Sequence, residues 1–279
     1  IVRFIVTGAT GQLGKALVRK LQLSSCDFVT VRHSEILDFT ENYQSRGAKT
    51  TIIHCAANTN VEQCQSNLLK TLHENYVPTI SLVELAKEIS AKFVYISSIG
   101  LYKDSEQPST ECAEVVTENH HHFSKYQSEN YIRAHLHSQL IIRTGWLFSR
   151  DRENPKNFIT RILNEAKVSD KLYANIEQFG MPTAVDFVAD AVIGLIEKNT
   201  LGTVNVVQDP IMSRYDFVNL ILGYSGDREN VTLKKVTNSH FNRISKVNMF
   251  EIASNELLKS LMPQLKFNSS TYLTEILKV

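Results

Sequence analysis

Three glycines near the start of the chain are spaced so that their backbone could hold a phosphate group. Gly8, Gly11 and Gly14 follow an apolar, β-branched segment at 1–7 and lead into an amphipathic segment at 15–23. In such a turn the glycines permit the tight bend, close approach of a pyrophosphate, and tight packing of the helix on the sheet. The free N–H groups that begin the helix then face the anion. The sequence therefore predicts a dinucleotide site with contacts from Gly8, Thr10, Gly11, Gln12, Leu13 and Gly14.

The type of dinucleotide depends on the residues that end the second predicted strand, at 28–31. An acidic side chain there binds the ribose 2′-hydroxyl of NAD, whereas an arginine accommodates the 2′-phosphate of NADP. This chain has Arg32 at that place and no acid before Glu35. A guanidinium can bind a phosphate through two parallel hydrogen bonds. We therefore expect NADP, with NAD as the alternative, and we expect Asp38 to touch the adenine edge.

Strands and helices alternate through the first half of the chain. Such alternation is typical of a parallel sheet with helices on both faces, which binds ligands at the carboxyl ends of its strands. Ala56 and Ala57 follow one of these strand ends, and their small side chains leave room for the cofactor backbone. The sequence predicts an α/β fold with a Rossmann-type doubly wound parallel sheet. Its further strands are expected at 51–54, 93–96 and 140–143, and its helices at 72–90 and 122–137.

The pattern loosens in the second half, where we expect a small C-terminal substrate lobe. Residues 1–148 are predicted to form the dinucleotide-binding domain, completed by parts of 185–207, and residues 149–279 to form mainly the lobe. Ser213 is a plausible N-cap for a helix that runs to Leu222. Other helices are expected at 156–167, 186–198, 254–261 and 270–278, and strands at 203–207 and 231–236.

Composition excludes several classes of function. A net charge of +1 provides no basic field for nucleic acid. No apolar run approaches the roughly 18 residues that a membrane span needs. A strand predicted from the first residue leaves no room for a signal peptide, and the four cysteines lack metal-type pairing. We therefore expect reduced thiols and a cytoplasmic protein.

A series of short motifs spreads over most of the chain in a characteristic order. It comprises Gly8 to Gly14, Ala56 to Glu62, Asn75-Tyr76-Val77-Pro78, Tyr95-Ile96-Ser97-Ser98, Arg143 to Phe148, and Pro182-Thr183 followed by Val185-Asp186. Together these motifs resemble the extended short-chain dehydrogenases/reductases, and within them the dTDP-4-dehydrorhamnose reductase family. The resemblance implies an oxidoreductase that binds NADP(H) or NAD(H), with Asn75 among the cofactor-binding residues. It also implies a nucleotide-sugar carbonyl substrate, and it is compatible with a homodimer or a protein partner.

The catalytic residues are implied by the same resemblance. The family transfers hydride to a ketone and relays a proton through a Ser/Thr, a Tyr and a Lys. Ser98 matches the hydroxyl that orients the carbonyl. Lys125, followed four residues later by Glu129, matches the lysine that holds the nicotinamide ribose and lowers the tyrosine pKa. The tyrosine position, four residues before Lys125, is occupied by His121, which this spacing places on the same helical face.

Three interpretations of His121 stay open. It could donate the proton, although it is shorter than tyrosine and repulsion from Lys125 lowers its pKa. Tyr126 or Tyr102 could serve instead, although Tyr126 lies about 100° around the helix and Tyr102 belongs to another segment. Finally, the relay could be lost in an NAD(P)-binding regulatory or scaffold protein. We favour the first, an NADP-dependent reductase of a 4-keto nucleotide sugar.

Two further groups of polar residues carry weaker signals. Three adjacent histidines at 120–122 diverge by about 100° per residue and cannot ligate one ion, so no metal site is predicted. Near the end of the chain, the Arg-Pro typical of the family is replaced by Arg243-Ile244. Because sugar-nucleotide phosphates need cations, the candidates are Arg152, Arg161, Arg243 and Lys246. Each of them is equally explained as a surface charge.

Overall fold

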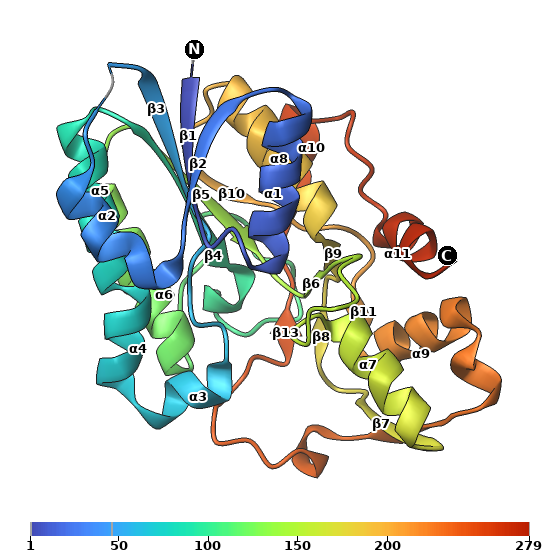
Figure 1. Ribbon diagram of the computed structural model, residues 1–279. Coiled ribbons are helices and arrows are strands. Elements are labelled where there is room, and N and C mark those ends of the chain that lie inside the picture. Colours follow the sequence, from blue (N-terminus) through green and yellow to red (C-terminus); the bar gives the residue numbers. More distant parts are fainter. Residues whose placement is uncertain (1, 46, 279) are drawn as a thin grey trace.

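A six-stranded parallel sheet forms the centre of the computed structural model, which describes residues 2–45 and 47–278 (Figure 1). The strand order is β10-β5-β4-β3-β1-β2, and every neighbouring pair is parallel. The chain runs from β1 to β2 on one side and then returns to place β3 on the other side of β1. The switch point of the strand order therefore lies between β1 and β3. The strands are β1 Val2–Thr7, β2 Asp27–Val31, β3 Lys49–His54, β4 Lys92–Ser98, β5 Gln139–Thr144 and β10 Gly202–Asn205.

Both faces of the sheet are buried, because alternate residues of each strand pack on opposite layers of helices. On β1, Phe4 and Val6 join one core cluster with Leu17 of α1. Ile5, which lies between them, joins a second cluster with Leu82 of α5. The sheet is doubly wound, as predicted, because the alternating apolar residues of its strands bury both of its faces.

Helices connect the strands. The helix predicted at 72–90 is instead two helices, which meet at Tyr76. Pro78 lies in the first turn of the second helix, where its missing N–H costs nothing. None of the described helices is long and apolar enough to cross a bilayer. The helices are α1 Gln12–Leu23, α2 Ile36–Asn42, α3 Val61–Ser66, α4 Leu68–Asn75, α5 Val77–Glu88, α6 His120–His135, α7 Phe158–Val168, α8 Val185–Glu197, α9 Arg214–Ser225, α10 Glu256–Leu261 and α11 Ser269–Leu277, with short 3-10 turns η1 His33–Glu35, η2 Ile99–Leu101, η3 Asp227–Glu229 and η4 Asn238–His240.

The second half of the chain adds small sheets below the carboxyl ends of the central strands (Figure 1). The predicted cap of α9 is confirmed, since Ser213 and Asp216 form a reciprocal capping box. Strand β7 was not predicted from the sequence. The domain division at residue 148 stays a prediction. The paired strands are β7 Lys171–Asn175 with β12 Thr232–Val236, β6 Leu147–Phe148 with β9 Thr183–Ala184, and β8 Phe179–Gly180 with β11 Met212–Ser213 and β13 Phe250–Glu251.

Candidate active site

The glycine loop between β1 and α1 is shaped so that only glycine fits at two of its positions. Gly8 has φ of 71°, and a Cβ there would lie 2.7 Å from the backbone nitrogen of Ala56. A Cβ on Gly14 would overlap the carbonyl oxygen of Gly8. Gly11 is the N-cap of α1 and has no side chain to cap the helix. The first N–H groups of α1 therefore stay accessible to an anion, as a pyrophosphate requires.

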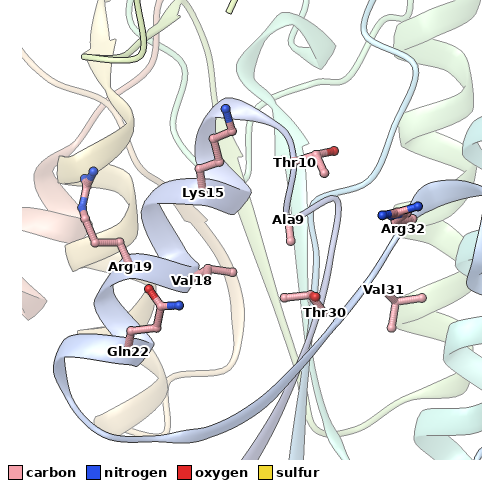
Figure 2. A pocket seen from close by; sticks show the side chains of 9 residues that line it. All are labelled: Ala9, Thr10, Lys15, Val18, Arg19, Gln22, Thr30, Val31 and Arg32. Carbon is pink, nitrogen blue, oxygen red and sulfur yellow. The ribbon is translucent and has the colours of Figure 1, made fainter. Parts of the chain in front are cut away.

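A cavity of about 380 Å³ lies beside this loop (Figure 2). Lys15 and Arg19 come from α1, four residues apart, and Arg32 lies across the cavity, directly after β2 (Figure 2). The lining thus holds three cations and no acid. The full lining is Ala9, Thr10, Lys15, Val18, Arg19, Gln22, Thr30, Val31 and Arg32.

Arg32 forms the weakest ion pair of the three cations. Its side chain is 76% exposed, and its guanidinium lies 3.9 Å from Glu35, an exposed pair that contributes little. Lys15 is 2.6 Å from Asp151, and Arg19 pairs with Asp186. The sequence predicted Thr10 and Arg32 at this place but missed Lys15 and Arg19. Their spacing of four residues along α1 was the available signal.

Thr10 and Arg32 line this cavity, and the other predicted cofactor residues do not. The Gln12 side chain accepts a hydrogen bond from Ser149 Oγ at 2.9 Å, and Leu13 is buried in the core. Asp38 lines a separate cavity of about 470 Å³ with Arg3, near the start of β1. It lies there because α2 begins at Ile36 and turns the chain away from the glycine loop. We therefore leave Asp38 out of the proposed cofactor site.

Ser98 ends β4 and is the N-cap of η2. Its Oγ accepts a hydrogen bond from the Gly100 backbone nitrogen at 3.0 Å. The hydroxyl hydrogen is not used in that bond, so it stays available to donate to a carbonyl oxygen. This is the property that the predicted role of Ser98 needs.

Lys125 is buried inside the protein. Its Nζ donates to the carbonyl oxygen of Ile96 at 2.7 Å and sits 4.8 Å from the ring centroid of Tyr95. Burial lowers the pKa of Lys125 to about 8, against the opposing charges of Cys55 and Glu129. The ammonium is therefore held on the same strand that carries Ser98, with a proton that it can lose in a moderately basic solution.

His121 lies on the same face of α6 as Lys125, as the spacing predicts. Its Nδ1 is 3.0 Å from the carbonyl oxygen of Asn58. A carbonyl can only accept, so Nδ1 carries the hydrogen and Nε2 is the acceptor in the neutral ring. Burial holds the pKa of His121 well below its ordinary value, and His122 and Lys125 lower it further. The imidazole is therefore neutral near pH 7.

The Asn58 carbonyl connects two helices at this site. It also accepts from Asn75 Nδ2 at 3.1 Å, while Asn75 Oδ1 accepts from the Asn58 nitrogen at 2.6 Å. Asn75 donates as well to Ser124 Oγ on α6 at 3.1 Å. The side chain of Asn75 thus fixes the loop that positions His121. Sequence reasoning gave Asn58 no role, because that role depends on a backbone carbonyl.

The structure removes one alternative proton donor. The Tyr102 hydroxyl donates to Asn205 Oδ1 at 2.7 Å in the interior, and the Arg143 guanidinium lies 4.7 Å from its ring centroid. Arg143 in turn binds Glu129 through two hydrogen bonds, of 3.0 and 2.6 Å. Tyr102 and Glu129 therefore belong to a buried structural network, and Tyr102 is not free to reach a substrate.

The three adjacent histidines face different partners. His120 Nδ1 lies 3.3 Å from the carbonyl oxygen of Cys64, and His122 Nδ1 lies 3.2 Å from Asn119 Nδ2. His121 faces Asn58, as described. Across residues 2–45 and 47–278, no group of three or more metal-ligating side chains converges.

Comparison with known proteins places these features in a family. The family described as "RmlD substrate binding domain" matches residues 2–250. The chain belongs to this family. The resemblance predicted from the motifs is therefore confirmed. The spore coat polysaccharide biosynthesis protein SpsK of Bacillus subtilis is 28% identical over 87% of this chain and 86% of its own length. A dTDP-4-keto-6-deoxy-D-glucose reductase of Streptomyces niveus is 25% identical over 78% of this chain and 77% of its own.

Solved structures of dTDP-4-dehydrorhamnose reductases confirm the fold. A dTDP-4-dehydrorhamnose reductase from Clostridium acetobutylicum superimposes with a TM-score of 0.91, covers 98% of both chains and is 24% identical. A dTDP-4-dehydrorhamnose reductase from Bacillus anthracis, solved in complex with NADP, gives a TM-score of 0.87 at 24% identity and covers 99% of this chain and 98% of its own. The predicted α/β fold with a Rossmann-type parallel sheet is thus confirmed.

Proposed function

We propose that this RmlD-family protein reduces a 4-keto nucleotide sugar, dTDP-4-dehydrorhamnose or a close relative, with NADPH. The observation that carries the proposal is the cavity beside the glycine loop, where Arg32 is exposed and only weakly paired with Glu35. A dinucleotide with an additional phosphate suits that charge better than NAD. The NADP complex of the Bacillus anthracis relative supports the same choice.

The residues beside the loop fit such a cofactor. The close approaches at Gly8 and Gly14 leave the backbone bare where a pyrophosphate would lie. Arg32 would bind the 2′-phosphate, with Lys15 and Arg19 adding positive charge across the cavity. Ala56 and Ala57 would border the cofactor path, and Lys125 would hold the nicotinamide ribose. The reduced nicotinamide, when bound, supplies the hydride.

The side chains of this chain would then handle the carbonyl oxygen. Ser98 donates its free hydroxyl hydrogen and orients the ketone. As the carbonyl carbon gains hydride, the alkoxide that forms needs one proton. In the proposal His121 takes the place of the tyrosine that usually provides it. Its Nε2 would have to be protonated first, and burial opposes that step. We therefore propose a reductase that is slow in proton transfer.

The protonation of His121 also supports a second candidate function. With Nδ1 bound to Asn58 and a neutral ring, His121 is a better hydrogen-bond acceptor than donor. This favours an NAD(P)-binding protein of the same fold that regulates or scaffolds a partner without turnover. The two proposals share the cofactor site and differ only in chemistry.

One assay separates them. NADPH oxidation is followed with an enzymatically prepared dTDP-4-keto-6-deoxy sugar, in the wild type and in Ser98→Ala. The reductase predicts turnover above background that the variant loses while it keeps its NADPH affinity. Tight NADPH binding without turnover on any 4-keto nucleotide sugar would support the regulatory alternative.

A further inference from the structure

Three buried polar side chains form a row between the glycine loop and α5. Thr7 ends β1, His54 ends β3, and Thr79 lies in the first turn of α5. Each of the three residues is at most 1% exposed. Polar groups that are buried so deeply cost free energy unless they are hydrogen-bonded. The proposed reaction gives none of the three a direct role, so their hydrogen bonds need a separate explanation.

The hydrogen bonds of this row run in one direction. Thr7 Oγ1 accepts from the Ala56 nitrogen at 3.3 Å and lies 2.7 Å from His54 Nδ1. His54 Nε2 lies 3.0 Å from Thr79 Oγ1, which donates to the Asn75 carbonyl oxygen at 2.9 Å. Because a threonine hydroxyl has one hydrogen, Thr79 must accept from Nε2, and Thr7 then donates to Nδ1. His54 is therefore neutral, and burial also lowers its pKa well below the ordinary value.

This row connects the two fixed points of the loop that follows β3. The first is the Ala56 nitrogen, which donates to Thr7. The second is Asn58, which exchanges two hydrogen bonds, of 2.6 and 3.1 Å, with the Asn75 side chain. Through His54, both points belong to one connected network of hydrogen bonds.

The far end of the network supports the break between α4 and α5. Asn75 is the last residue of α4. Pro78 has no N–H for the Glu74 carbonyl four residues earlier, and His33 Nε2 donates to that carbonyl at 2.6 Å. Thr79 binds the next carbonyl, that of Asn75. Side chains thus hold the break, and they fix the place from which the Asn75 side chain extends.

The orientation of His121 depends on the loop that this network holds. The Asn58 carbonyl oxygen lies 3.0 Å from His121 Nδ1 and keeps the hydrogen of the neutral ring on that atom. Residues 55–60, which include this carbonyl, are neither helix nor strand. The loop therefore takes its position from its hydrogen bonds to neighbouring elements, and a shift of the loop would release the imidazole.

We propose that His54 is a positioning residue for His121. It acts through Thr79 on Asn75, and through the Asn75 side chain on the Asn58 carbonyl. The inference rests on the proposed function, in which His121 provides the proton. A ring that is fixed by Nδ1 keeps Nε2 in one direction, whereas a ring that rotates presents it for only part of the time. Loss of the network should therefore slow the reaction and leave cofactor affinity unchanged.

The Thr79 hydroxyl allows a mild test, because valine matches the shape of threonine without a hydroxyl and serine keeps the hydroxyl. NMR of the histidine ring nitrogens reports which nitrogen carries the hydrogen, in protein without cofactor or substrate. The His121 signals are assigned by their absence in His121→Gln. We expect one tautomer, with hydrogen on Nδ1, in the wild type and in Thr79→Ser. In Thr79→Val we expect the His121 ring to exchange between two tautomers.

Steady-state kinetics with the keto sugar give a second readout. Thr79→Val should lower kcat by about fivefold or more and leave the KM for NADPH at the wild-type value. Thr79→Ser should restore most of kcat. His54→Leu removes both bonds of the imidazole and should act in the same direction. Because that variant also risks unfolding, the two Thr79 variants decide the test.

Thr274→Val is the matched control. The Thr274 hydroxyl on α11 donates to the Ser270 carbonyl four residues earlier at 2.8 Å, as Thr79 does to Asn75. Its loss should leave the His121 signals and kcat unchanged.

The inference is overturned if the wild type lacks a single Nδ1–H tautomer, or if Thr79→Val keeps it. An equal change in Thr79→Ser or in Thr274→Val would also overturn it, because the effect would then not come from the Thr79 hydroxyl. A changed tautomer in Thr79→Val alone, with a wild type that reduces no keto sugar, would uphold the positioning of His121 and reject the reductase.

Discussion

The Nδ1 atom of His121 lies 3.0 Å from the carbonyl oxygen of Asn58, which fixes the neutral ring with its hydrogen on Nδ1. The nitrogen that would face a substrate is therefore an acceptor. A catalytic acid at this place must carry a proton in its resting form, which a tyrosine hydroxyl does near pH 7.

Replacement of His121 by tyrosine should therefore raise the rate of reduction. General acid catalysis contributes about 10²–10⁴-fold, so we expect His121→Tyr to increase kcat by about tenfold or more with little change in KM. Steady-state NADPH oxidation measures both constants. His121→Phe, which fills the place without a proton, should show no gain. An equal response of the two variants would contradict a proton-transfer role for this position.

The cofactor preference should depend on Arg32. A hydrogen bond to a charged group is worth about 1.5–3 kcal/mol, so Arg32→Gln should weaken NADPH binding by about tenfold or more and leave NADH binding nearly unchanged. Fluorescence titration with both cofactors measures this. Lys20→Gln is the control, because Lys20 lies on α1 but pairs with Asp190 and does not line the cavity. Equal losses for both cofactors in Arg32→Gln would remove the proposed role of its guanidinium.

The pH dependence of stability should reveal the burial of Lys125. Its pKa is about 8 in the folded protein and lies near the ordinary 10.5 in the unfolded chain. Between these values the unfolded chain binds more protons, so the stability contributed at this site rises with pH from about 8 to 10.5. Relative to Lys125→Met, the free energy of unfolding of the wild type should gain on the order of 3 kcal/mol over that interval. Urea titrations of both proteins from pH 7 to 10.5 measure the difference. If stability changes with pH in the same way in both proteins, the pKa of Lys125 is not lowered in the folded protein.

Two helical glycines provide a matched test of the loop geometry. Gly14→Ala places a Cβ on the Gly8 carbonyl, and such overpacking costs about 1–3 kcal/mol. Gly223 lies in α9, and a Cβ added there would meet nothing within 4 Å, so Gly223→Ala should stabilise the protein by about 0.5–1 kcal/mol. Thermal unfolding should therefore shift in opposite directions for the two variants. Gly14→Ala should also lose NADPH affinity, and wild-type affinity in that variant would contradict a pyrophosphate site at the loop.

Local patterns were enough to predict the central part of the fold. The strands could be predicted because each is a short apolar run, and the glycine loop because its positions admit no side chain. The capping box at Ser213 could be predicted because it is made within four residues. The break between α4 and α5 had a signal in Pro78, which the apolar periodicity of the region obscured.

Tertiary contacts explain what the sequence did not predict. Lys15 and Arg19 are typical of surface charges in the sequence, and only the packing of α1 beside β2 makes them part of one cavity lining. Arg161 of α7 and Arg214 of α9 are far apart in sequence, and they come together because both guanidinium groups lie over the Phe158 ring. Asp38 lies away from that cavity for the opposite reason, since it belongs to the short helix α2 and lines a cavity with Arg3 near the start of β1. The candidates that could be predicted were those for which neighbouring residues fixed the geometry.

The central claim is that this site transfers hydride from NADPH to a 4-keto nucleotide sugar. A single-turnover experiment tests it most directly, with excess protein, NADPH and freshly prepared dTDP-4-keto-6-deoxy sugar, followed by nicotinamide absorbance and chromatography of the sugar nucleotide. We predict loss of NADPH matched one for one by a reduced sugar nucleotide, at a rate that Ser98→Ala abolishes. Tight binding of NADPH with the keto sugar recovered unchanged would contradict the claim.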